Sequence, residues 1–188
     1  MSASAPGPAL GLLELESLAR GVVVADALVK QAQVSIAIAE GVSPGKYLLV
    51  FVGSEAEVAE SFKAGLEAGG AMVIDSLHLH QVAEPVVAAL LRGEISKVSA
   101  GDSVGIVELH TVAATLRSAD VALKSANVRL TQFQIAKGIG GKGWFTLAGE
   151  QHDVEAALES AAASIPVNLL VTTELISRPH AELRGRVL

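Results

Sequence analysis

The chain has no cysteine among its 188 residues, which excludes disulfides, thiolate metal sites and cysteine nucleophiles. Aromatic residues are also scarce, at 3% of a sequence that is 51% hydrophobic. The core must therefore be built from Ala, Val, Leu and Ile, whose small side chains suit helices packed closely on a sheet. The length allows one ordinary domain or two small ones.

Several kinds of partner have no signature in the sequence. The net charge is −6, and there is no basic run or interleaving of basic and aromatic residues that would indicate nucleic-acid binding. The apolar run Tyr47–Val52 is far shorter than the roughly 20 residues that span a bilayer. Residues 1–8 lack the basic and long apolar regions of a signal peptide and are expected to form a disordered tail. We therefore expect a soluble intracellular protein with no nucleic-acid or membrane partner.

Two glycine-rich stretches that end in Gly-Lys, Glu40–Lys46 and Ala136–Lys142, occupy matching places in the two halves of the chain. Each follows one apolar run and precedes a second run that ends in a glycine. Working residues concentrate on loops that a rigid scaffold presents, so these stretches are the first candidates for function.

The two halves are copies of one domain. With a shift of 94 positions, nine of the 25 residues in Leu10–Val34 are identical to their counterparts. After the glycine-rich stretches the shift becomes 96, which aligns Gly45 and Lys46 with Gly141 and Lys142. An ordered series of matches of this kind indicates an internal duplication.

Apolar runs and helical periodicity predict the same order of elements in each half. The expected strands are Leu10–Leu15, Val34–Ala39, Tyr47–Val52, Ala71–His80, Val104–Leu109, Val128–Ala136, Trp144–Ala148 and Val167–Ser177. The expected helices are Ser17–Ala32, a helix from the Ser54–Glu57 capping box to about Ala68, Gln81–Arg92, Thr111–Ala126 and Glu150–Ala163. The order β-α-β-β-α-β predicts an α+β fold, an α/β sandwich of two tandem ferredoxin-like domains with antiparallel sheets and helices on one side. We place the domains at 9–96 and 103–188, joined by a linker at 97–102 within the polar stretch Gly93–Ser103.

The repeat resembles that of bacterial microcompartment shell proteins with two fused shell domains. The residues that carry the resemblance are Ala9–Glu14, Ala25–Lys30, Val104–Glu108, Ala119–Asp120, Leu123–Val128, Gly138–Lys142 and Arg178–His180. The order of elements is that of the unpermuted branch, similar to the trimeric shell protein of propanediol utilisation that carries an iron–sulfur cluster. The resemblance covers nearly the whole chain after the first eight residues.

The resemblance implies a structural protein and not an enzyme. Three chains would form a homotrimer that mimics a hexagon, because each chain supplies two of six wedge-shaped domains. Such tiles would pack edge to edge, together with hexameric and pentameric shell proteins, into the shell of a microcompartment in the cytoplasm. A central pore would pass small polar metabolites.

The resemblance also assigns the candidate site residues. The loop after the second strand of each half would line the pore: Gly41, Val42, Ser43, Pro44, Gly45, Gly138, Ile139, Gly140 and Gly141. Glycine permits the close backbone approach that loops converging on an axis require. Ser43 stands where the cluster-carrying relative has its pore-facing cysteine. Since iron–sulfur clusters are held by thiolates, we expect no cluster and no other cofactor.

Residues at the tile edge are implied in the same way. Lys30 and Lys124 match a lysine that packs against its counterpart in a neighbouring tile. Arg178 matches an edge arginine in an Arg-Pro-His motif. The first half has the sequence His-Gln-Val from His80 at this place, so its edge contact is expected to be weaker or different.

The glycines also match two nucleotide-binding patterns in part. Gly138, Gly140 and Gly143 have the spacing of a dinucleotide-binding turn, but the next residues predict a strand where that motif needs a helix. The Gly141-Lys142 pair lacks the first glycine and the Ser or Thr of a phosphate-binding loop. Neither pattern therefore indicates a nucleotide site.

Candidate catalytic and metal-binding residues are equally incomplete. His78 and His80 share one face of a predicted strand, but no third ligand is adjacent in the sequence, which favours surface histidines. Glu14 and Glu108 are the same position of the repeat, so they do not indicate an acid–base pair. No catalytic arrangement has a recognisable spacing, and we expect no metal site and no enzymatic activity.

One alternative from a different class stays open, a ferredoxin-like small-molecule-binding regulatory module with its ligand at the domain junction. Such a sensor would remain a discrete oligomer and would be stabilised by its ligand. Lys30 and Lys124 would then be ordinary solvated lysines at helix C-termini, where the helix dipole favours a positive charge.

Overall fold

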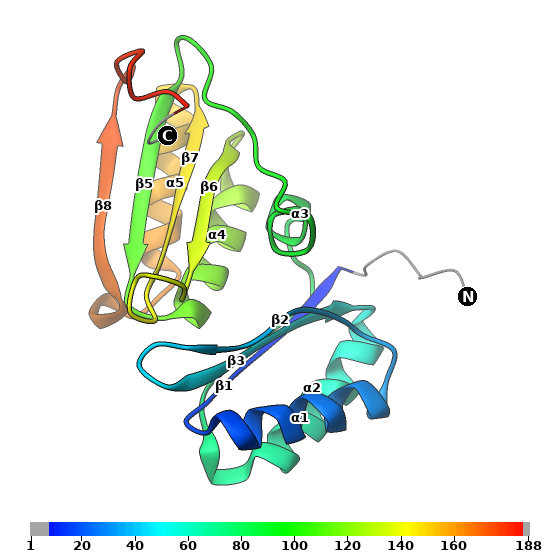
Figure 1. Ribbon diagram of the computed structural model, residues 1–188. Coiled ribbons are helices and arrows are strands. Elements are labelled where there is room, and N and C mark those ends of the chain that lie inside the picture. The colour runs from blue at the N-terminus through cyan, green and yellow to red at the C-terminus, as the bar shows by residue number, and fades with distance from the viewer. Residues whose placement is uncertain (1–7, 186–188) are drawn as a thin grey trace. The chain divides into compact units, whose positions relative to one another are not determined.

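The computed structural model describes residues 8–185, so the predicted tail at 1–8 lies almost entirely outside it. The chain divides into two compact units, residues 1–91 and 92–188. Each unit has one four-stranded sheet with two long helices packed on one face, as Figure 1 shows. The predicted α+β fold of two tandem domains is confirmed.

The order of elements is β-α-β-β-α-β in both units, as the sequence predicts. The first unit contains β1 (Ala9–Leu15), α1 (Leu18–Gln31), β2 (Ser35–Val42), β3 (Lys46–Gly53), α2 (Glu55–Gly69) and β4 (Val73–Leu79), followed by α3 (Glu84–Arg92). The second contains β5 (Ser103–Leu109), α4 (Val112–Ser125), β6 (Arg129–Ile135), β7 (Gly143–Gly149), α5 (Gln151–Ala163) and β8 (Leu170–Ile176). Short 3-10 helices, Gly70–Met72 and Val167–Leu169, precede the last strand of each unit.

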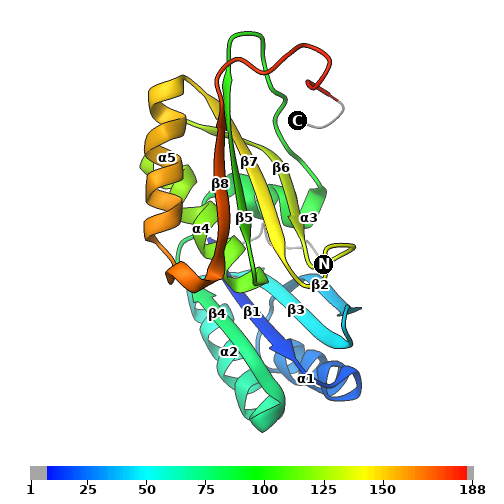
Figure 2. The ribbon, with the colours of Figure 1, turned by 90° about the vertical axis from the view of Figure 1, so that its left-hand side faces the viewer.

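Both sheets are antiparallel, with the orders β2-β3-β1-β4 and β6-β7-β5-β8. Figure 2 shows β4, β1 and β3 side by side with α1 and α2 on one face. The first strand of each unit is therefore central, between the strand that follows the loop and the last strand. None of the helices within residues 8–185 has the length and hydropathy of a membrane span.

Side-chain caps explain where three of the helices begin. Ser17 and Thr111, equivalent residues of the repeat, each accept a hydrogen bond from a backbone N–H three residues later, at 3.2 and 3.1 Å. Ser54 and Glu57 form the predicted capping box of α2, in which each side chain bonds the backbone N–H of the other residue. These bonds satisfy N–H groups that the first helical turn leaves unpaired.

The core of the first unit lies between the sheet and its helices. Leu13 and Phe51 pack there with Val24 and Leu28 of α1. Gly11 lies directly beneath the Phe51 ring, and a Cβ added to it would be 2.3 Å from the ring carbon Cζ. A glycine in the central strand is therefore required by packing and not by a turn.

Several predicted element boundaries are wrong. The last strands begin two or three residues later than expected, at Val73 and Leu170, because 3-10 helices occupy the preceding residues. Helix α3 begins at Glu84 and not at Gln81. Strand β2 continues to Val42, three residues beyond the predicted end, because its pairing with β3 extends to the contact between Val42 and Lys46.

The pairing register also corrects one match between the two halves. Leu10 and its counterpart Val104 pair with Leu79 and Ile176, so the last strands are related by a shift of 97. The second half has one more residue between its second helix and last strand than the first half. Gln81, and not His80, therefore corresponds to Arg178.

Candidate functional site

The first glycine-rich stretch forms a tight turn between β2 and β3. The N–H of Gly45 donates to the carbonyl of Val42 at 2.8 Å, and Gly45 has a φ of 115°, a conformation that glycine adopts without strain. Ser43, Pro44 and Gly45 are exposed, whereas the side chain of Val42 is buried. Ser43 and Pro44 are thus the side chains that this turn presents to its surroundings.

The second stretch forms a longer loop between β6 and β7. The Ala136 N–H donates to the carbonyl of Lys142 at 2.8 Å and closes the loop at its base. Positive φ angles recur inside it, at Gly138, Gly140 and Gly141, and also at the buried Ala136, whose φ is 59°. Glycine at three of these four places lets the backbone turn repeatedly within a few residues.

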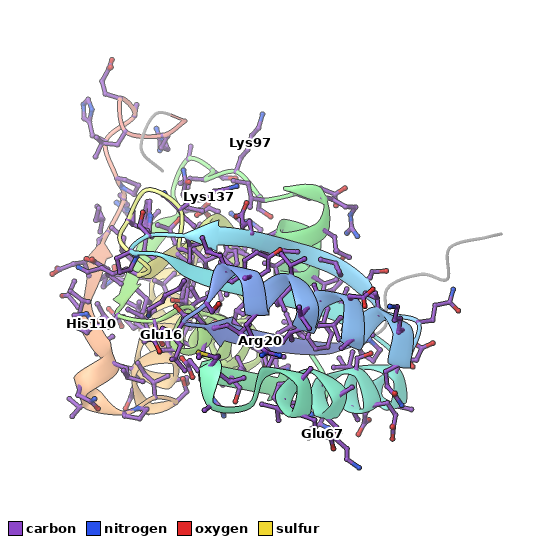
Figure 3. The ribbon with its side chains drawn as sticks, turned by 60° about the horizontal axis from the view of Figure 1, so that its bottom comes forward. Glu16, Arg20, Glu67, Lys97, His110 and Lys137 are labelled. Carbon is purple, nitrogen blue, oxygen red and sulfur yellow. The ribbon has the colours of Figure 1, made fainter. Side chains whose placement is uncertain are left out.

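Two side chains support this loop from the strands. The Gln134 amide nitrogen donates to the carbonyl of Lys137 at 2.9 Å, and the indole N–H of Trp144 donates to the Gln134 amide oxygen at 3.0 Å. Lys137, labelled in Figure 3, lies in the loop with an exposed side chain. Ile139 is half-buried, so the loop presents both a cation and an apolar side chain.

An ion pair between a glutamate and a lysine lies at the base of each loop. The sequence identified these residues as equivalent positions of the repeat but did not predict that they contact one another. Lys46 Nζ lies 3.0 Å from Glu14 Oε1, and Lys142 Nζ lies 2.9 Å from Glu108 Oε1. The Glu14 side chain is only 3% exposed. The pair follows from the register of β1 and β3, in which Glu14 faces Leu48, two residues from Lys46.

The predicted edge lysines also form equivalent ion pairs. Lys30 Nζ lies 2.6 Å from Asp26 Oδ2, and Lys124 Nζ lies 2.7 Å from Asp120 Oδ2, one helical turn earlier in each case. Both lysines stand in the last turn of their helices. Arg178 is exposed just after β8 and has a φ of 57°.

His80, the fourth predicted edge residue, belongs to a cluster that exists only in the first unit. Its Nδ1 atom lies 3.3 Å from Glu55 Oε1, and its ring is 4.4 Å from that of His78. The His78 ring stacks on Phe62 at 5.3 Å, and its Nε2 atom is buried without a hydrogen-bond partner in the part of the chain described. Burial and the neighbouring His80 lower the pKa of His78, and Glu55 opposes this effect.

A metal site at these histidines has no support in the geometry. Within residues 8–185, no three His, Cys, Asp or Glu side chains are arranged as metal ligands are. The residues at the matching places of the second unit are Gln151, Leu158, Leu175 and Ser177. The cluster is therefore a difference between the two copies and not part of the repeated site.

Helix α1 carries apolar side chains on its exposed surface. On α1, the apolar side chains Leu18 and Val22 are 49% and 58% exposed. Arg20, on α1 in Figure 3, donates to the carbonyl of Ala68 at 3.4 Å and thereby connects α1 to α2.

Comparison with known proteins agrees with the repeat. The family model described as "BMC domain" matches the chain twice, over residues 9–82 and 103–179. The bacterial microcompartment shell protein PduT of Citrobacter freundii is 37% identical over 176 residues, which are 93% of this chain and 95% of that protein.

Two solved structures have the same architecture. A microcompartment protein from Desulfitobacterium hafniense superposes with a TM-score of 0.85 at 33% identity, covering 94% of this chain and 98% of its own. A fused permuted hexameric shell protein of the RMM microcompartment superposes with a TM-score of 0.62 at 24% identity, over 85% of this chain and 81% of its own, and shares the fold. With two matching domains and a relative above 30% identity over nearly its full length, the chain belongs to the bacterial microcompartment shell proteins and carries two shell domains in tandem.

Proposed function

We propose that three copies of this chain form a pseudohexameric tile of a bacterial microcompartment shell in the cytoplasm, with a central pore for small polar metabolites. The family is structural and not enzymatic, and its members assemble into microcompartment shells. The trimer and the pore are the specific part of the proposal. Hexameric and pentameric shell proteins would be the other partners.

The exposed apolar face of α1 is the observation that carries the trimer. Leu18, Val22, Val23 and Val29 all have more than 40% of their surface exposed. An exposed apolar patch of this kind indicates a surface that another chain covers. Because each chain holds two copies of the domain, three chains would supply the six domains of a hexagon.

The pore would be lined by the two glycine-rich loops. The two loops connect equivalent strands of the two units. A pseudosixfold ring of three chains would therefore bring six loops to its axis, with loops of the first and second units alternating. Exposed Ser43 and Pro44 would alternate there with Gly138, Ile139 and Gly140 around the passage. Because the side chain of Val42 is buried, Val42 would line the pore with its backbone only. With Ser43 in place of a thiolate, the pore has no cluster ligand.

Contacts between tiles would use Lys30, Lys124 and Arg178, with His80 near the corresponding place in the first unit. A repeated flat contact of this type extends an assembly and does not close it. Each lysine forms an ion pair with the aspartate one helical turn earlier, Asp26 or Asp120.

Replacing Lys30 and Lys124 together by aspartate tests the edge assignment. Aspartate lacks the long aliphatic stem that would pack across each contact and adds a carboxylate beside Asp26 or Asp120, so trimers should persist while extended sheets disappear in negative-stain images. Lys63→Asp, at an exposed position of α2, is the matched control and should leave the sheets intact. Sheets that persist in the double variant would refute the edge assignment.

A further inference from the structure

The two loop-base ion pairs, Glu14–Lys46 and Glu108–Lys142, lie on the same face of their sheets. Neighbouring residues of a strand point to opposite faces. Leu13 and Leu15 pack in the core with Val24 of α1, so Glu14 points to the face opposite α1 and α2. Lys46 reaches it there, at the end of the sheet from which the loop projects.

The second unit has the same arrangement. A Cβ on Gly105 would be 2.8 Å from Val154 of α5, and one on Gly143 would be 2.2 Å from the Thr115 hydroxyl oxygen of α4. Both glycines therefore face the helices. Glu108, three residues after Gly105, and Lys142, the residue before Gly143, point the other way.

Each ammonium group is partly open to solvent. Side-chain exposure is 37% for Lys46 and 40% for Lys142, so both can act electrostatically on a solute near the loops. An isolated charge acts over a Debye length of about 8 Å at physiological ionic strength. A contact pair at about 3 Å has no net charge, and its field falls off more steeply with distance.

The ionisable residues of the two loops give these glutamates a specific role. The stretches Glu40–Lys46 and Ala136–Lys142 contain three lysines but only one glutamate. Glu14 and Glu108 lie outside both stretches, on the neighbouring strands. With them included, three glutamates balance the three lysines. Three chains would otherwise gather an excess of positive charge around one axis, and such a field concentrates anions.

We propose that Glu14 and Glu108 are the charge-balancing residues of the pore, and that the solutes it passes are uncharged polar molecules. By neutralising Lys46 and Lys142 they prevent the passage from favouring anions over cations. This inference rests on the proposed trimeric pore. The lysines also belong to the closure of each loop, through the pairing of Lys46 with Val42 and of Lys142 with Ala136.

The test uses shells assembled from fixed hexameric and pentameric partners, with and without the full-length chain, and loaded with a fluorescent protein. Entry is followed by collisional quenching with iodide, acrylamide and caesium, which are small anionic, neutral and cationic probes. Glu108→Gln should raise the ratio of iodide entry to caesium entry about threefold or more, and Lys142→Gln should lower it. The double variant should return to the wild-type ratio.

Glu14→Gln supplies an independent arm, because it leaves Lys46 unpaired but partly solvated. It should shift the ratio in the same direction as Glu108→Gln. Raising the salt concentration to about 1 M should remove the shifts, since the Debye length is then about 3 Å. Glu60→Gln, an exposed charge change on α2, should have no effect.

The outcomes separate the two proposals. Shells whose probe entry is the same with and without this chain would contradict the pore itself. Shells that admit probes through the wild-type chain, but in which Glu108→Gln and Lys142→Gln shift the ratio in the same direction or not at all, would overturn charge balance alone. A purely structural role of the pairs predicts that both substitutions impair entry of all three probes equally.

Discussion

At the scale of single residues, side-chain packing explains why particular positions need glycine, which the composition does not explain. Gly11 sits under Phe51 in the centre of the first sheet, where no turn demands a glycine. Both halves have glycine at this place, but the aromatic ring lies over Gly11 only. In the second unit the equivalent Gly105 faces Val154 and Leu158 instead.

Gly11→Ala should therefore lower the free energy of unfolding by about 1–3 kcal/mol, the usual cost of forcing an extra carbon into a packed core. Urea denaturation would measure the change. Combining it with Phe51→Leu should cost less than the sum of the two single substitutions, because the smaller side chain makes room. Additive effects would show that the contact is not the cause.

His78 gives the first unit a dependence on pH. Its pKa is lowered from the usual 6.5 by burial and by His80, so the unfolded chain binds the proton more readily than the folded one. The stabilising effect is complete above pH 6.5 and is lost as the pH falls through the lower pKa of the folded state. The free energy of unfolding should thus decrease from pH 7 to pH 5.

His78→Leu, which introduces the residue found at the matching position of the second unit, should flatten this decrease in denaturation curves. His152→Leu is the control, since the His152 side chain is 80% exposed. An unchanged pH dependence in His78→Leu would mean that other groups cause it.

At the scale of elements, local chemistry determines the starts of helices. The Ser54 hydroxyl accepts a hydrogen bond from the Glu57 N–H, and the Glu57 carboxylate accepts bonds from the Ser54 N–H and hydroxyl. Position 150, the equivalent N-cap of α5, holds a glutamate whose side chain makes no capping bond. The two units therefore offer a matched comparison.

Ser54→Ala should destabilise the protein by about 1 kcal/mol, the typical contribution of an N-cap. Glu150→Ala should change the stability by much less, because no capping bond is lost there. Thermal unfolding of both variants would measure the difference. Equal effects would contradict the assigned role of the capping box.

The features that the sequence could predict at this scale are those set by residues close together along the chain. The capping box and the order of helices and strands along the chain depend on neighbouring residues or on a repeated pattern, and both are confirmed. The end of β2 at Val42, the 3-10 helices before β4 and β8, and the ion pairs of Glu14 and Glu108 depend on strand register. Register is fixed by tertiary packing, so these features could not be placed from periodicity alone.

At the scale of the whole molecule, duplication has produced two units that are alike in fold and different in surface. The loops, the ion pairs at their bases and the lysines at the helix ends recur in both. The histidine cluster belongs to the first unit only. A trimer would use the exposed apolar face of α1 to contact the next chain.

The most direct test of the trimer is native mass spectrometry of the purified chain, alone and with Val22→Glu. The wild type should have the mass of three chains, and Val22→Glu, which places a charge in the apolar face of α1, should shift the population to folded monomers. Val167→Glu, at a residue that is 86% exposed elsewhere, should remain trimeric. A wild-type protein that is stably monomeric, or a Val22→Glu variant that is as trimeric as the wild type, would contradict the account.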